Sequence, residues 1–149
     1  MLKQKISEDL KSAMKSGDSF KRDVLRFLDS AVKNVEIEKK KRETGLTDEE
    51  IVEVIARLSK QRKDSMEQYE KGGRADLVEK EKKELEILMQ YMPQQLSEDE
   101  LRVIVKETIS AVGATSASDT GKVMGAVMGK VKGKTDGNAV KKIVGEELK

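Results

Sequence analysis

The residues best suited to chemistry in this chain are glycines with lysines among them. Five glycines recur at every fourth position, namely Gly121, Gly125, Gly129, Gly133 and Gly137. A glycine costs a helix roughly 1 kcal/mol relative to alanine, so its repetition indicates that the bare backbone is used. Two uses are open: close approach of a neighbouring helix, or close approach of a nucleic-acid backbone.

The lysines make the second use worth considering. Residues 119–142 include six lysines and two aspartates, a local charge of +4 in a chain whose net charge is +2. The candidate RNA-binding lysines are Lys122, Lys130, Lys132, Lys134, Lys141 and Lys142. With backbone N–H groups at a helix start near Asp136 and Gly137, they would form an anion-binding corner. The motif that would permit close approach consists of Gly121, Met124, Gly125, Gly129, Gly133, Asp136 and Gly137.

Catalytic chemistry finds little support in the sequence. The 149 residues include no histidine and no cysteine, which removes the usual general base at neutral pH, thiol nucleophiles and disulfides. Gly133, Lys134 and Thr135 look like the end of a phosphate-binding loop, but Met128 stands where its first glycine is required. We therefore expect no catalytic residue, no metal and no cofactor.

Two other polar groups each allow a structural and a functional interpretation. The basic run 39–42 would contact phosphates or simply end a helix, where the helix dipole favours cations. A second cluster surrounds the Gly72-Gly73 turn and consists of Arg62, Ser65, Arg74, Asp76, Glu81 and Glu84. We expect this cluster to fix how two helices meet, and a binding cleft is the functional alternative.

The elements that position these residues are predicted to be helices. Charged residues make up 39% of the chain, hydrophobic residues 36% and aromatics only 3%, a mixture that favours amphipathic helices over sheets. No apolar stretch follows Met1, and no window approaches the ~18 uncharged residues of a membrane span. The sequence therefore predicts an all-α, cytoplasmic protein without a membrane segment.

Helix start and stop signals divide the chain at Pro93, its single proline. Before Pro93, we expect a helix ending near Gly17, a second with the apolar stripe Phe20–Val35 running to Gly45, a third opened by Thr47-x-x-Glu50, and a fourth over 76–92. After it, we expect a helix opened by Ser97-x-x-Glu100, the glycine-rich helix ending near Lys132, and a last helix opened by Thr135 or Asp136. The predicted domains are a bundle of about four helices over 1–92 and a compact three-helix module over 97–149.

The glycine-rich region resembles a known family. The run Gly121-Lys122-Val123-Met124-Gly125, with Met128, Lys132-Gly133, Asp136-Gly137 and Ile143-Val144, is similar to the C-terminal tail domain of GatB, the tRNA-handling subunit of glutamine-dependent Asp/Glu-tRNA amidotransferases. The whole chain, including Gly73–Leu77 and Tyr91-Met92-Pro93, resembles the YqeY family. The resemblance implies tRNA binding by the tail and places the amidotransfer chemistry in a domain that this chain does not resemble.

These observations give three hypotheses for function. The first is a non-catalytic accessory module that binds the backbone of a structured RNA, in particular tRNA. The second is an adaptor that docks on a tRNA-linked enzyme through the face of Met124 and Met128 or through the N-terminal bundle. The third, implied by the resemblance alone, is a part of a carbon–nitrogen ligase that uses glutamine as the amide donor.

Overall fold

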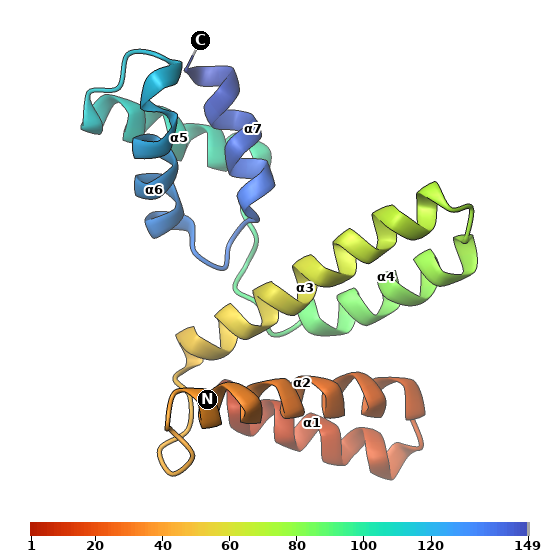
Figure 1. Ribbon diagram of the computed structural model, residues 1–149. Coiled ribbons are helices and arrows are strands. Elements are labelled where there is room, and N and C mark those ends of the chain that lie inside the picture. The colour runs from red at the N-terminus through yellow and green to blue at the C-terminus, as the bar shows by residue number, and fades with distance from the viewer. Residues whose placement is uncertain (149) are drawn as a thin grey trace. The chain divides into compact units, whose positions relative to one another are not determined.

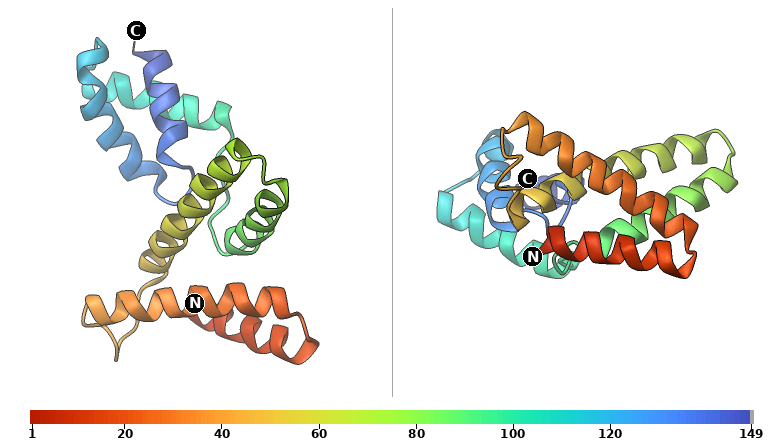
Figure 2. Two further views of the ribbon diagram at one scale, coloured as in Figure 1. Left: turned by 45° about the vertical axis from the view of Figure 1, so that its right-hand side comes forward. Right: turned by 90° about the horizontal axis from the view of Figure 1, so that it is seen from below.

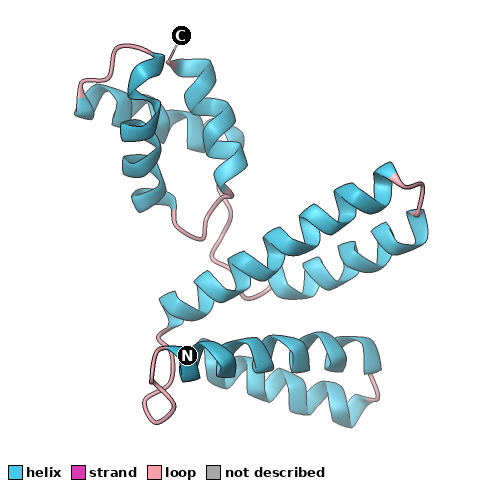
Figure 3. Ribbon diagram, viewed as in Figure 1, coloured by secondary structure: helices cyan, strands magenta, loops and turns pink. Residues whose placement is uncertain are grey.

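The protein is entirely helical over the residues that the structure describes. The computed structural model describes residues 1–148 and contains seven α-helices, one short 3-10 helix and no strand in that range (Figures 1 and 3). The predicted all-α fold is confirmed. The chain separates into two compact units, Met1–Met92 and Pro93–Lys149, each with a hydrophobic core of its own.

The N-terminal unit consists of two antiparallel helix pairs (Figures 1 and 2). Its helices are α1 (Leu2–Ser16), α2 (Ser19–Glu38), α3 (Asp48–Lys71) and α4 (Ala75–Met89). The core is made chiefly of aliphatic side chains from α2 and α3, among which Leu25, Leu28, Ile51 and Ile55 are completely buried. Burying one such side chain stabilises a fold by roughly 1.5–3 kcal/mol, so these residues hold the two pairs together.

Capping residues set the helix ends in this unit. Gly17 ends α1 in the left-handed conformation, and the Asp18 side chain accepts a hydrogen bond from the backbone N–H of Lys21. Thr47 and Glu50 form the predicted capping box at the start of α3, with both reciprocal hydrogen bonds present. Such a box satisfies two backbone N–H groups that a helix start otherwise leaves without partners.

The helix α2 is shorter than predicted, because it ends at Glu38 rather than at Gly45. After Glu38 the chain turns back: the N–H of Lys41 donates to the carbonyl of Glu36 at 2.7 Å, and Lys40 adopts a positive φ of 56°. The ammonium groups of Lys39 and Lys41 then lie 2.9 and 2.7 Å from the Glu50 carboxylate. The basic run thus neutralises the carboxylate that opens the next helix.

The C-terminal unit packs three helices around a core rich in valine. These are α5 (Glu98–Val112), α6 (Thr120–Val131) and α7 (Gly137–Glu147), with the 3-10 helix η1 (Ala117–Asp119) leading into α6. The core residues are Leu101, Val105, Val123, Val127, Val131, Val140, Ile143, Val144 and Leu148. Because valine is small, three short helices pack closely around a compact centre.

Polar contacts fix the helices of this unit to one another. The Arg102 guanidinium on α5 lies 2.7 Å from carboxylate oxygens of Glu146 and Glu147 on α7. The backbone N–H of Leu96 donates to the carbonyl of Lys134 at 2.8 Å. The segment before α5 is therefore tied to the loop between α6 and α7.

None of the described helices is both long enough and apolar enough to cross a bilayer.

Candidate nucleic-acid interface

The glycine row of α6 lies on the outside of the C-terminal unit. At Gly121, Gly125 and Gly129, an added Cβ would meet no atom within 4 Å apart from the helix's own nearby backbone. All three residues are exposed. Of the two uses left open for these glycines, close approach of a neighbouring helix is thus not seen among residues 1–148 of this chain. The valines of α6 make the contact with α5 and α7 instead, and the glycines expose a strip of bare helix backbone.

The burial pattern of α6 explains why the glycines face outward. Val123, Val127 and Val131 are completely buried, and Met124 and Met128 are half-buried against the same core. At about 100° per residue, the glycines fall on the side of the helix that these residues leave open. Met124 thus belongs to the border of the core, while the glycine row and the lysines beside it form the exposed face.

Two lysines beside the glycine row are held by contacts to α5. The Lys122 ammonium group donates to the backbone carbonyl of Val112 at 3.0 Å, and the Lys130 ammonium group donates to the hydroxyl of Thr108 at 3.0 Å. Each contact uses one of the three donors of an ammonium group, so both lysines retain donors for an anion. Both side chains lie on the exposed surface of the unit.

The other four lysines lie after the glycine-rich helix and are also exposed. Lys132 directly follows α6, and Gly133 reverses the chain with a φ of 77°. Lys141 and Lys142 are on α7, between the core residues Val140 and Ile143. We call the exposed surface of Gly121, Gly125, Gly129, Lys122 and Lys130 on α6 the glycine–lysine face. The structure places Lys132 and Lys134 at its C-terminal end and Lys141 and Lys142 on α7.

The predicted anion-binding corner at the start of α7 is already occupied by a carboxylate. The Asp136 side chain accepts a hydrogen bond from the backbone N–H of Ala139 at 2.8 Å. This bond uses one of the backbone N–H donors at the helix start, and the negative charge of Asp136 opposes the approach of a phosphate there. Asp136 thus caps α7, and Gly137 is its first residue.

A second carboxylate organises the entry to α6. The Asp119 side chain accepts hydrogen bonds from the backbone N–H groups of Thr115 at 3.0 Å and Ser116 at 3.4 Å. These bonds lower the pKa of Asp119 below its ordinary value, and the nearby Lys122 ammonium adds to the effect. The loop before the glycine–lysine face is consequently held in place by its own hydrogen bonds.

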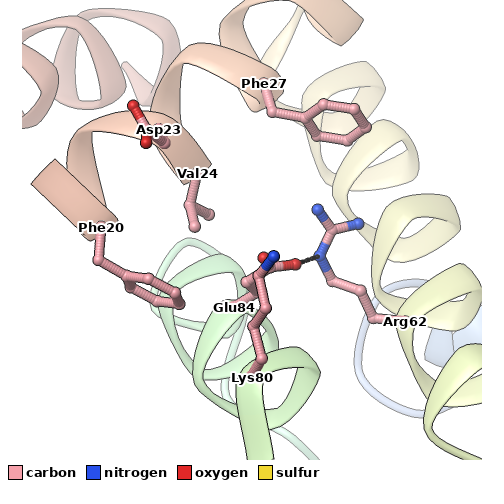
Figure 4. Close-up of a pocket in the computed structure, with 7 residues that line it drawn as sticks. All are labelled: Phe20, Asp23, Val24, Phe27, Arg62, Lys80 and Glu84. Carbon is pink, nitrogen blue, oxygen red and sulfur yellow. Dashed lines mark ion pairs between the residues drawn. The ribbon is translucent and has the colours of Figure 1, made fainter. Parts of the chain in front are cut away.

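The N-terminal unit contains a pocket, and two of its lining residues, Arg62 and Glu84, belong to the cluster for which a binding cleft was the functional alternative. The pocket has a volume of about 270 Å³ and is lined by Phe20, Asp23, Val24 and Phe27 of α2, Arg62 of α3, and Lys80 and Glu84 of α4 (Figure 4). Phe20 and Phe27 were assigned to the apolar stripe of α2, but they are 36% and 49% exposed. Both phenylalanines lie at the edge of that stripe, and this position in the sequence could have indicated their exposure.

The polar cluster predicted around the Gly72-Gly73 turn is only partly brought together. Arg62 and Glu84 do link α3 to α4, with Nε and Oε2 3.2 Å apart. Arg74 instead pairs with Asp76 at the exposed start of α4. Burial and the neighbouring Glu84 carboxylate raise the pKa of Glu81. Within residues 1–148, no group of three or more carboxylates is arranged to hold a metal ion.

Almost the whole chain matches a known protein family. A family model described as "Yqey-like protein" matches residues 3–148. The chain therefore belongs to the YqeY-like family, as its sequence motifs suggested.

Curated relatives share the family's sequence over part of their length. They are named "Altered inheritance of mitochondria protein 41, mitochondrial" and come from yeasts. The protein of Lachancea thermotolerans is 37% identical over 89 residues, which cover 60% of this chain and 46% of that protein. The protein of Kluyveromyces lactis is 40% identical over 86 residues, 58% of this chain and 45% of that protein. The protein of Saccharomyces cerevisiae strain YJM789 is 36% identical over 89 residues, 60% of this chain and 47% of that protein. The matched region thus spans about half the length of these relatives.

These names overturn the predicted cytoplasmic location. The relatives are named as mitochondrial proteins, and the cytoplasmic prediction is wrong. It rested on the missing apolar stretch after Met1, which bears on secretory signals alone. Mitochondrial targeting segments are amphipathic and rich in arginine, so an apolar run is the wrong feature by which to judge that compartment.

Proposed function

We propose that this protein is a non-catalytic RNA-binding module whose glycine–lysine face contacts the backbone of a structured RNA. The observation that supports the proposal most is the exposed glycine row: nothing lies within 4 Å of the Cβ positions of Gly121, Gly125 and Gly129 outside the helix itself. Exposed glycines in a helix are destabilising, and no packing contact within the unit compensates for them. Access for a ligand that lies flat against the backbone is a reason to keep them.

The charge of the region supports an anionic ligand. The six exposed lysines of residues 122–142 would supply phosphate contacts around the bare backbone of α6. Phosphate contacts provide most of the affinity of non-specific nucleic-acid binding. The C-terminal unit contains no aromatic residue, so it would recognise an RNA by its backbone and shape. The resemblance to the tail domain of GatB supports tRNA as the RNA.

The test is a titration of the full-length protein with bulk tRNA over a series of salt concentrations. Each phosphate-contacting lysine contributes roughly −0.7 to −0.9 to the slope of log K against log salt concentration. Replacing Lys122 and Lys130, the two lysines of the glycine–lysine face, by glutamine should therefore weaken binding and flatten the slope. A matched control is replacement of Lys11 and Lys15 on α1, which are exposed lysines outside the proposed face.

Two results would contradict the proposal. The first is no retention of tRNA even at low salt. The second is an equal effect of the α1 and the glycine–lysine substitutions, which would indicate general charge attraction rather than a face. Affinity purification with nuclease treatment distinguishes the adaptor hypothesis from RNA binding. A protein partner bound through the half-buried Met124 and Met128 would remain bound after the RNA is removed.

A further inference from the structure

The pocket of the N-terminal unit exposes two of the chain's four aromatic side chains. Phe20 is 36% and Phe27 49% exposed. Val24, which lies between them in the sequence, is buried in the core. The phenylalanines lie on one side of α2, seven residues and about 10.5 Å apart along its axis. The two phenylalanines are thus about two helical turns apart. Val24, between them in the sequence, is among the residues that line the pocket (Figure 4).

A buried guanidinium supports one of the rings. The carbon of the Arg62 guanidinium lies 4.9 Å from the centre of the Phe27 ring. Arg62 is 12% exposed and Glu84 16%, and they form an ion pair rather than a hydrogen bond, because the buried Arg62 Nε finds no acceptor in hydrogen-bonding geometry. A cation over an aromatic ring is attracted to it electrostatically, and only weakly at an exposed site. The contact therefore favours this orientation of the Phe27 ring, which remains 49% exposed.

The charged side chains that line the pocket are two cations, Arg62 and Lys80, and two carboxylates, Asp23 and Glu84. Glu84 is paired with Arg62, and Asp23 is paired with Arg22, whose Nε lies 3.0 Å from an oxygen of Asp23. Lys80 is therefore the cation that the lining offers to an anionic ligand. Aromatic rings beside basic side chains are the combination that binds unpaired nucleotides, since the bases stack and the phosphates pair with cations.

We infer that this pocket binds an unpaired nucleotide of RNA, with its base stacked on the Phe27 ring and its phosphate near Lys80. The carboxylates of Asp23 and Glu84 are acceptors for the amino groups that adenine, cytosine and guanine carry and uracil lacks. The inference rests on the proposed function in taking RNA as the ligand. It adds a single-stranded site in the N-terminal unit to the backbone site of the C-terminal unit.

The experiment compares two RNA probes on the full-length protein. One is a blunt hairpin, and the other is the same hairpin with a short single-stranded adenosine tail that contains one 2-aminopurine, whose fluorescence falls when the base stacks. The tailed hairpin should bind more tightly and be quenched. Phe27→Leu keeps apolar volume but removes the ring, so it should weaken binding of the tailed hairpin by roughly 5- to 100-fold and abolish quenching. Phe27→Trp should retain both.

Controls separate this site from the proposed glycine–lysine face. Ile37→Ala changes another exposed apolar residue of α2, 54% exposed, and should have no effect. Lys130→Gln should weaken both hairpins equally. Equal binding of the two hairpins, unchanged by Phe27→Leu, overturns the inference and leaves the proposed function standing. If the tailed hairpin binds more tightly than the blunt one but Lys130→Gln changes neither affinity, the inference stands and the proposed function is overturned. Loss of a nuclease-resistant protein partner in Phe27→Leu, without an effect on RNA, would assign the pocket to protein docking and overturn the inference.

Discussion

Replacing Gly125 by alanine should stabilise the C-terminal unit by about 1 kcal/mol. An alanine methyl at this position meets no atom within 4 Å beyond the helix's own nearby backbone, and the φ of Gly125 is not positive. The substitution therefore adds no clash and no backbone strain. It removes the excess conformational freedom of glycine in the unfolded chain, which is worth roughly 0.5–1 kcal/mol inside a helix.

Calorimetry of the full-length protein measures this effect. For a unit of this size, 1 kcal/mol corresponds to a rise in Tm of roughly 4–8 °C. Gly145→Ala is the matched control, because Gly145 is also helical, exposed and free of neighbours within 4 Å, and it lies outside the glycine–lysine face. It should give a similar rise. Gly113→Ala should lower the Tm, because Gly113 has a φ of 68°. A fall in Tm for Gly125→Ala would refute the reasoning, because it would mean that the glycine row is covered in the folded protein.

The remaining predictions concern the N-terminal unit. Tyr91→Phe removes the hydrogen bond that the buried tyrosine donates to the Asp9 carboxylate at 2.6 Å. The free energy of unfolding, measured in urea, should fall by about 1–2 kcal/mol. An unchanged free energy of unfolding would show that this bond contributes nothing to stability. Glu50→Gln keeps the capping box but removes the charge that Lys39 and Lys41 neutralise. Because these contacts lower the pKa of Glu50, their stabilisation is present above its ordinary value of 4.5 and is lost as the pH falls through the lowered pKa. The difference in Tm between wild type and variant should thus be full at pH 7 and shrink in acid, and a pH-independent difference would contradict the assignment.

Local signals predicted the helix boundaries where the determining contacts are short in sequence. The capping boxes Thr47–Glu50 and Ser97–Glu100 each involve residues three apart, and both are present in the structure. The glycines that end α1 and α5, Gly17 and Gly113, have the left-handed conformation that such positions favour.

The errors arose where a distant residue decides the outcome. The sequence pattern extends α2 through the basic run, but Glu50 of the following helix attracts Lys39 and Lys41 and the helix ends at Glu38. Periodicity places Phe20 and Phe27 on the apolar stripe without showing that other residues complete the core. For the glycine row, the spacing specifies a shared side of a helix, and only the burial of the α6 valines shows that this side faces outward.

The central claim is that the glycine–lysine face must be bare backbone to bind RNA. The most direct test is the tRNA affinity of Gly125→Ala, measured beside wild type and Gly145→Ala at one salt concentration. If the claim holds, Gly125→Ala should bind tRNA roughly tenfold more weakly, a loss of about 1.4 kcal/mol, while Gly145→Ala binds as wild type does. Equal affinities for all three proteins would contradict it, because they would show that RNA does not approach the backbone of α6.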